Sequence, residues 1–346
     1  MVQQWSNLVL DIVVMVMATV LTALAVRLHS NSGFAGASLV TVMNFGENLS
    51  GIVIYYTRLE TSIGAIARLK TFNEDVKPED KQEEDIIPPE QWPYSGEVEL
   101  KGVSASYDSS SHRTKINSGE KIAICGRTGS GKSSFKALLL KLLDPLPDAP
   151  GEAIIDNTPL NRINRQTLRQ RIIAVPQEAV FLPDGFTFKA NLDPSDVSTA
   201  EACQSVLEAV GMWLFVQEWG GLNAGMNGGV LSAGQRQLLS LGRALLRRRI
   251  RAQNLGLGEG RSEGGFLLLD EVSSTVDHET EFLMQEIIRN EFKAYTVISG
   301  SHRLDMIMDF DTVVVMDTGK IIEVRNPMVL ANKETKFGEL VKAGAR

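Results

Sequence analysis

The sequence predicts an α/β domain with a mostly parallel sheet and flanking helices, preceded by two transmembrane helices. Three observations support this prediction. There are two apolar stretches near the N-terminus, a glycine-rich phosphate-binding pattern between an apolar run and a leucine-rich run, and short apolar runs that alternate with helical patterns downstream. Continuous apolar runs suit parallel strands that are buried on both faces. We expect residues 1–72 to form the membrane part, residues 73–95 an acidic linker, and residues 96–346 the α/β domain.

Composition excludes some classes of protein. The 346 residues carry a net charge of −7, which argues against a surface that coats nucleic acid. Only two cysteines are present, so neither a disulfide framework nor a cysteine-based metal site is expected. This cysteine usage fits a reducing compartment.

The first apolar stretch, Leu8–Val26, is interrupted only by Asp11 and two threonines. A helix of this length spans nearly the whole hydrocarbon layer of a membrane. A cleaved signal peptide is less favoured, because no Lys or Arg precedes the stretch and because the stretch is long.

The second stretch, Gly33–Tyr56, contains polar residues that usually face a helix bundle or a water-filled cavity rather than lipid: Asn44, Glu47 and Asn48. Basic residues follow it directly (Arg58, Arg68 and Lys70), which places that side in the cytoplasm. The hairpin therefore returns both of its ends to the cytoplasm. The alternative is a pair of buried helices in a soluble domain, because the second span is weak.

Beyond the second span, apolar residues recur at helical spacing, which predicts an amphipathic extension of the helix: Leu59, Ile63, Ile66 and Leu69. Composition then changes sharply. Glu74–Glu90 is acidic and contains three prolines, so it is expected to be a solvated linker.

The phosphate-binding pattern is GRTGSGKS, which fits G-x-x-x-x-G-K-[ST]. A predicted strand, Lys121–Cys125, precedes it, and a predicted helix, Ser134–Leu143, follows it. Lys132 is expected to reach the β- and γ-phosphates, and Ser133 to hold Mg²⁺. The alternative is a Gly/Ser-rich surface turn. The candidate nucleotide-binding residues of this loop are Gly126, Arg127, Thr128, Gly129, Ser130, Gly131, Lys132, Ser133 and Ser134.

The other predicted strands flank this loop along the chain. Gly96–Ser106 alternates like an edge strand and ends at Tyr107, whose ring could stack on adenine or be merely an exposed strand end. The clearest buried strands and a terminal hairpin are Ile172–Val175, Phe266–Leu269, Thr296–Ile298, and Val313–Met316 with Ile321–Val324. Asp193–Trp219 is predicted to be helical, with Ser198 and Glu201 spaced as a capping box.

Two carboxylates end one of these strands, in Phe266-Leu267-Leu268-Leu269-Asp270-Glu271. In a P-loop enzyme the Asp at such a strand end completes the Mg²⁺ site, so Asp270 is the expected metal ligand. Glu271 is placed to orient and deprotonate an attacking water. Taken alone, the pattern is weak, because many buried strands end in acidic residues.

Leu231-Ser232-Ala233-Gly234-Gln235 opens a helix whose apolar face continues through Leu238 and Leu241. A Ser and a Gly at a helix N-terminus would form a second anion site. A simple capped helix start is the alternative, and spacing alone does not exclude it.

These parts together resemble the ATP-binding-cassette (ABC) transporter family. LSAGQRQLLSLGRALLR is similar to its signature motif, GRTGSGKS to its Walker A and LLLDE to its Walker B with the catalytic glutamate. The resemblance extends to an adenine-stacking aromatic, a Q-loop, a D-loop and a switch histidine, matched respectively by Tyr107, Gln177, Asp277 and His302. The tracts GRTGSGKSS, VPQE and NLDP resemble the second nucleotide-binding domain of subfamily C, the multidrug-resistance-associated type, and the N-terminal part resembles that subfamily's last two membrane spans.

The resemblance implies an ABC-type P-loop fold with small antiparallel and helical subdomains. It implies that Gln177 takes part in catalysis and helps to hold Mg²⁺, and that His302 steadies the γ-phosphate. It further implies that Ser232 and Gly234 act on nucleotide held by an opposite domain, and that Gln235 and Asp277 contribute to nucleotide binding.

The sequence departs from the family at three places. A family half-transporter has six spans, whereas this sequence shows two. Between Tyr107 and Gly119 the family has a further strand, and its loss puts the small antiparallel subdomain and the adenine platform in doubt. An extra basic, Gly-rich stretch at 247–265 is expected to form a surface loop.

The expected function is ATP binding and Mg²⁺-dependent hydrolysis that drives export of a small molecule, as the C-terminal part of a multi-pass membrane protein with its nucleotide-binding domain in the cytoplasm. The expected partners are membrane lipid, a second nucleotide-binding domain and the transported small molecule, and no nucleic acid. Two alternatives remain: a soluble ABC-type ATPase of DNA maintenance, and a catalytically inactive truncated fragment.

Overall fold

The computed structural model describes residues 2–28, 32–76, 78–79, 81, 83–101, 113–145, 151–256, 264–271, 276–300, 307–331 and 335–344. The chain divides into two compact units, Met1–Glu79 and Asp80–Arg346. Each unit is described by itself.

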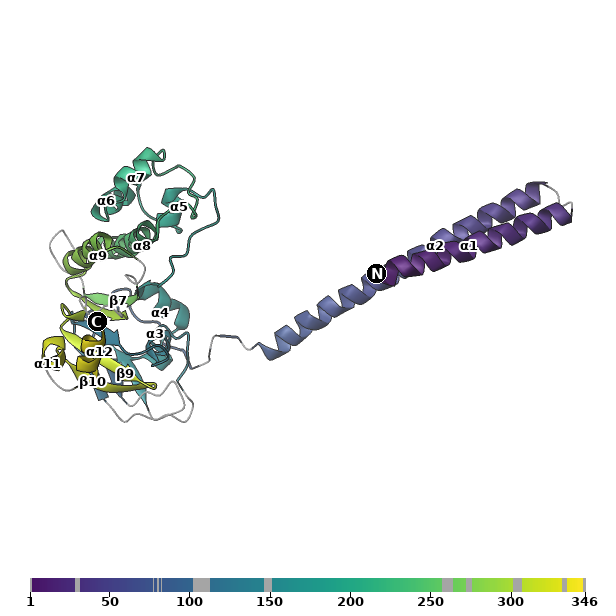
Figure 1. Ribbon diagram of the computed structural model, residues 1–346. Coiled ribbons are helices and arrows are strands. Elements are labelled where there is room, and N and C mark those ends of the chain that lie inside the picture. The colour runs from purple at the N-terminus through teal and green to yellow at the C-terminus, as the bar shows by residue number, and fades with distance from the viewer. Residues whose placement is uncertain are drawn as a thin grey trace. The chain divides into compact units, whose positions relative to one another are not determined.

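The first unit consists of two helices that lie side by side, α1 (Val2–Arg27) and α2 (Ser32–Asp75) (Figure 1). Two segments are long and apolar enough to cross a membrane: Leu8–Arg27, with a mean hydropathy of 2.5, and Gly33–Asp75, with 1.2. The helices pack closely at Gly46, where a Cβ atom would come within 2.6 Å of Val14 Cγ2. The amphipathic extension predicted from the sequence continues α2 without a break.

The apolar surface of this helix pair is largely exposed, including Leu8, Ile12 and Ile52. The polar residues at positions 44, 47 and 48 are exposed as well. Within this unit, therefore, they do not face the partner helix.

The larger sheet of the second unit has the strand order β10-β9-β3-β8-β7-β6 among the described strands. Strands β9, β3, β8, β7 and β6 are parallel, and β10 pairs antiparallel with β9 as the predicted terminal hairpin. The strand bounds are β3 Lys121–Cys125, β6 Ile173–Val175, β7 Gly265–Asp270, β8 Tyr295–Gly300, β9 Thr312–Asp317 and β10 Lys320–Arg325. The apolar runs from which the sheet was predicted form its strands, and all of them except the terminal strand β10 are mostly buried.

The smaller sheet is antiparallel, in the order β2-β1-β4-β5, where the strands are β1 Val98–Lys101, β2 Arg113–Ile116, β4 Glu152–Ile155 and β5 Thr158–Pro159. Two expectations are corrected here. The antiparallel sheet is present despite the short segment before Gly119, because Arg113–Ile116 pairs with β1. In addition, β1 is not an edge strand, since β4 pairs with its other side.

Helices cover the larger sheet, with α5, α6 and α7 grouped beside α8 in a helical region (Figure 1). Their bounds, with the short 3₁₀ helix η1, are α3 Lys132–Leu139, η1 Leu160–Arg162, α4 Arg165–Arg171, α5 Phe188–Leu192, α6 Ala200–Ala209, α7 Trp213–Glu218, α8 Ala233–Asn254, α9 His278–Glu291, α11 Pro327–Ala331 and α12 Lys336–Gly344.

The sequence predicted a helical segment over Asp193–Trp219. The prediction is wrong in its extent, because the segment forms the two separate helices α6 and α7. The predicted capping box is also wrong. Thr199 caps α6 by accepting a hydrogen bond from the Ala202 N–H, whereas Ser198 donates its hydroxyl hydrogen to Asp193.

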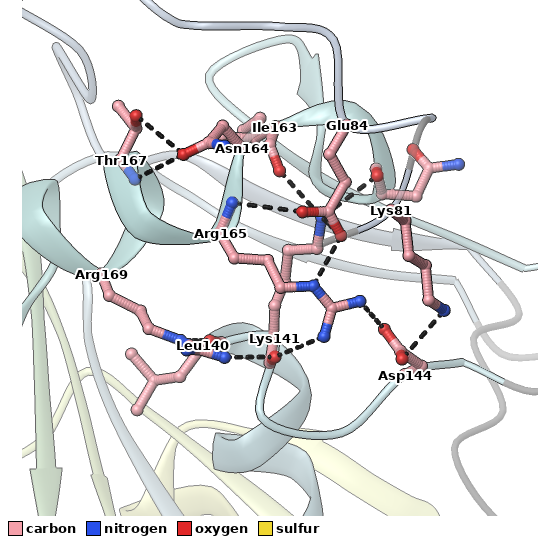
Figure 2. A network of polar contacts seen from close by, with 11 residues as sticks. Lys81, Glu84, Leu140, Lys141, Asp144, Ile163, Asn164, Arg165, Thr167 and Arg169 are labelled. Atoms are coloured by element: carbon pink, nitrogen blue, oxygen red, sulfur yellow. Dashed lines mark hydrogen bonds and ion pairs between the residues drawn. The ribbon is translucent and has the colours of Figure 1, made fainter. Parts of the chain in front are cut away.

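The linker over residues 73–95 was expected to be solvated, but its second part packs on the α/β domain. The Ile86 N–H donates to the Arg162 carbonyl at 2.9 Å, and the Trp92 side chain is buried. The Glu84 side chain is only 2% exposed and makes ion pairs with Lys141 (2.8 Å) and Arg165 (2.6 Å) (Figure 2). We call this arrangement of Glu84, Lys141 and Arg165 the linker clasp.

Candidate functional site

The P-loop connects the carboxyl end of β3 to the start of α3. Gly126, Gly129 and Gly131 have φ angles of +154°, +82° and +101°, a region that L side chains rarely adopt. A Cβ atom on Gly126 would lie 2.2 Å from the Met316 carbonyl oxygen, so the turn also requires glycine for space. The glycines of the pattern are therefore needed to form this turn.

Two polar side chains of the loop are buried, those of Lys132 and Ser130. Lys132 is buried, and its ammonium donates to the carbonyl oxygens of Gly126 (2.9 Å) and Arg127 (3.3 Å). Burial lowers the pKa of Lys132, and the negative charge of Glu271 partly offsets this effect. The buried Ser130 hydroxyl has no hydrogen-bond partner. A cation and an unsatisfied hydroxyl inside a glycine-rich loop fit a phosphate group.

The two carboxylates of β7 lie at the same sheet edge. Gly300 of β8 is in register with Ile124 of β3 on one side and with Asp270 of β7 on the other. Glu271 follows with a φ of +46°, and its N–H donates to the Gly300 carbonyl at 3.0 Å. The structure therefore brings the P-loop and both carboxylates together at the carboxyl edge of the parallel strands, where ligands bind in open α/β sheets.

Asp270 has a cationic partner that the sequence analysis missed. Lys136, on the P-loop helix α3, forms an ion pair with the Asp270 carboxylate and is 3% exposed. Burial lowers its pKa to about 8. The signal in the sequence was the spacing, because Lys132 and Lys136 are four residues apart and share one face of a helix.

Gln177 is two residues beyond the end of β6 and is exposed. Its carbonyl accepts a hydrogen bond from the side-chain amide of Gln237 on α8. The predicted Q-loop residue is thus attached to the helix that begins at the signature sequence.

The signature sequence forms the N-terminus of α8 and carries a complete capping box. The Ser232 hydroxyl accepts from the Gln235 N–H at 3.1 Å, and the Gln235 side-chain oxygen accepts from the Ser232 N–H at 2.9 Å. Gly234 lies against α9, since an added Cβ would be 3.2 Å from Thr280 and 3.6 Å from the Asp277 carboxylate. Asp277 is itself the N-cap of α9 and accepts from the Thr280 N–H.

Not all the predicted site residues come together. Among the described residues, no hydrogen bond or ion pair joins Ser232, Gly234 or Gln235 to the P-loop. Arg127, Thr128, Gly129, Ser133 and Ser134 are exposed at the loop and the start of α3. Tyr107 and His302 lie outside the described residues.

The donor set fits Mg²⁺ in part. The hydroxyl of Ser133 and the carboxylate of Asp270 are hard oxygen ligands, which Mg²⁺ prefers, and Mg²⁺ commonly takes its other ligands from phosphates and water. Accordingly, the described ranges contain no cluster of three or more His, Cys, Asp or Glu residues suited to a metal ion. Lys136, however, already neutralises Asp270.

Comparison with known proteins agrees with this geometry. Residues 109–250 match the ABC transporter family. The ABC-type transporter braE of Annulohypoxylon truncatum is 60% identical over 374 aligned positions, which cover 99% of this chain and 25% of the relative. The ABC transporter FGM5 of Gibberella zeae is 47% identical, and the aligned positions cover 96% of this chain and 24% of the relative.

A solved structure confirms the fold. The bacterial Atm1-family ABC exporter with ATP bound aligns with a TM-score of 0.69 and 22% identity, over 90% of this chain and 52% of that chain. The ABC-type P-loop fold predicted from the sequence is thereby confirmed. The chain spans about a quarter of the length of the curated relatives it matches.

Proposed function

We propose that this chain binds ATP at the P-loop and hydrolyses it to drive export of a small molecule, as the C-terminal part of an ABC transporter of the multidrug-resistance-associated type. The observation that carries the proposal is the shared sheet edge, where the P-loop follows β3 and Asp270 and Glu271 end β7. The family match over residues 109–250 supports the same activity.

In this proposal each residue has a defined task. Lys132 and the loop N–H groups bind the β- and γ-phosphates, because a cation and the backbone N–H groups of a glycine-rich loop attract phosphate. Ser133, Asp270 and Gln177 would hold Mg²⁺, which when bound neutralises charge on the phosphates. Glu271 orients the attacking water and accepts its proton. His302 steadies the γ-phosphate, and Tyr107 stacks on adenine.

The complete site requires a second domain. Ser232 caps α8 and its described hydrogen bonds join it to Gln235, while Gly234 lies against Thr280 of α9. In the family's head-to-tail arrangement, these residues and Asp277 would act on ATP held by an opposite nucleotide-binding domain. A lone domain then supplies only part of the donor set that lowers the barrier to hydrolysis.

The membrane location is also proposed. The two apolar helices are long enough to cross a bilayer, and their exposed apolar surface favours a lipid or helix-bundle environment over a soluble ATPase of DNA maintenance. With basic residues following the second span, the nucleotide-binding domain lies on the cytoplasmic side.

The test is ATP turnover per chain across a wide dilution series, with and without a separately expressed N-terminal half. The proposal predicts that turnover rises with concentration or on adding that half. It also predicts that Glu271→Gln retains ATP affinity but loses about 10²- to 10⁴-fold in turnover, because the glutamine cannot act as a base.

Three results would contradict the proposal. A constant, substantial turnover down to concentrations at which the chain is monomeric would refute the composite site. Unchanged turnover in Glu271→Gln would place the base elsewhere, and absence of turnover under every condition would favour the inactive fragment.

A further inference from the structure

Three structural elements, α3, β7 and β8, surround the buried ammonium group of Lys136. Lys136 comes from α3, one turn after Lys132, and its side chain is 4% exposed. Its ammonium lies against the carboxylate of Asp270 on β7. The third element is β8, where a Cβ atom on Gly300 would lie 2.8 Å from the Lys136 ammonium and 3.9 Å from the Asp270 carboxylate. The glycine therefore leaves the space that the ammonium occupies.

The two lysines of α3 have different partners. Lys132 donates to the carbonyl oxygens of its own loop, whereas Lys136 pairs with Asp270. A buried ammonium is strongly destabilising unless an opposite charge accompanies it, so Lys136 and Asp270 form a unit in which each charge compensates the other.

This pair changes what Asp270 offers to a divalent cation. A carboxylate whose charge is already neutralised attracts Mg²⁺ less, and the nearby ammonium repels it. The same pairing removes the net negative charge that an unpaired Asp270 would place at the sheet edge, where it would repel the phosphates.

We propose that Lys136 is a built-in counter-ion of Asp270 that takes over part of the electrostatic role of the divalent cation, so that this chain binds ATP with little dependence on Mg²⁺. The inference rests on the proposed ATP-binding function of the same site. It concerns binding, not the rate of hydrolysis.

The test measures the dissociation constant of a fluorescent ATP analogue for the full chain, in excess Mg²⁺ and in excess EDTA. For the wild type we expect the two dissociation constants to agree within about threefold, which is less than the tenfold change that corresponds to about 1.4 kcal/mol of binding free energy. Lys136→Met, which removes the charge but keeps a similar length, should bind at least about tenfold more tightly with Mg²⁺ than with EDTA. Lys136→Arg keeps the charge and should behave as the wild type does.

A second readout is the affinity for Mn²⁺ in the presence of ATP, measured by electron paramagnetic resonance. It should rise at least about tenfold in Lys136→Met. A wild-type ratio of tenfold or more between the two conditions would overturn the inference, even if Lys136→Met fails to fold. The inference would also be overturned if folded Lys136→Met showed the same small ratio between its dissociation constants in EDTA and in Mg²⁺ as the wild type does. If the wild type shows no saturable binding under either condition, the proposed function fails and this inference fails with it.

Discussion

Glu84→Gln tests whether the linker clasp stabilises the nucleotide-binding domain. The Glu84 carboxylate is the anion between two buried cations, Lys141 and Arg165, whose side chains are 6% and 5% exposed. Glutamine has nearly the same shape but no charge. The substitution therefore leaves two buried positive charges facing a neutral group (Figure 2).

The expected cost follows from what the two cations retain. Lys141 keeps hydrogen bonds to the carbonyl oxygens of Asn161 (3.1 Å) and Ile163 (2.8 Å), and Arg165 keeps its 2.6 Å ion pair with Asp144. Breaking a buried ion pair costs about 3 to 5 kcal/mol, and these remaining bonds place the loss near 3 kcal/mol. A loss of about 3 kcal/mol raises the equilibrium constant for opening of the domain about 150-fold.

Thiol labelling of the full chain measures this change. Cys125 in β3 and Cys203 in α6 are the only cysteines, and both are buried. Burial raises the pKa of Cys125 to about 12, so this thiol reacts only when the domain opens. The labelling rate of Glu84→Gln should exceed that of the wild type by about two orders of magnitude.

Glu83→Gln is the matched control, because it makes the same chemical change at an exposed neighbour. If Glu84→Gln were labelled as slowly as Glu83→Gln, the clasp would not stabilise the domain and the reasoning would be refuted.

The clasp also has a defined pH dependence. Burial alone would raise the pKa of Glu84, but the hydrogen bonds and charges of Lys141 and Arg165 together lower it. A lowered pKa contributes stability that is present above the unfolded value of about 4.3 and is lost as pH falls through the folded value. The difference between the wild type and Glu84→Gln should therefore shrink below about pH 4, measured with a thiol reagent that reacts in acid.

Two further predictions concern the signature helix and the membrane helices. Ser232→Ala removes the hydroxyl that accepts from the Gln235 N–H and should destabilise the domain by about 1 kcal/mol, measured by urea unfolding. Ser232→Thr should retain most of the cap. Equal urea midpoints for the two variants would contradict this prediction. The full chain should stay in the membrane pellet on carbonate extraction, because α1 contains a 20-residue apolar segment; release into the supernatant would favour the soluble-ATPase alternative.

The sequence predicted the parts of the fold that depend on strong local signals. The buried strands ending at Cys125, Asp270 and Gly300 were found because their apolar runs are continuous. The P-loop was found because its glycines recur at a fixed spacing, and in the structure these glycines have positive φ angles. The order of the strands follows from long-range pairing, which no local pattern contains. The position of β1 inside its sheet was therefore predicted wrongly.

Buried charges were the main omission. Glu84 lies in an acidic stretch that looks solvated, and Lys136 lies in a helix that was predicted from its leucines. Each is buried because its partner arrives from another element, Lys141 and Arg165 for Glu84, and Asp270 for Lys136. Residue type and spacing can place such side chains on a helix face, but they do not identify the opposite charge that makes burial possible.

The most direct test of nucleotide binding at the P-loop is the affinity of the full chain for labelled ATP in the wild type, Lys132→Ala and Lys293→Ala. Lys132 is buried within the loop, whereas Lys293 is exposed and lies between α9 and β8. Loss of charge-assisted bonds to phosphate should weaken binding about 10- to 150-fold in Lys132→Ala, corresponding to about 1.5 to 3 kcal/mol, and Lys293→Ala should bind as the wild type does. Equal affinity in the wild type and Lys132→Ala would contradict the assignment of this loop as the ATP site.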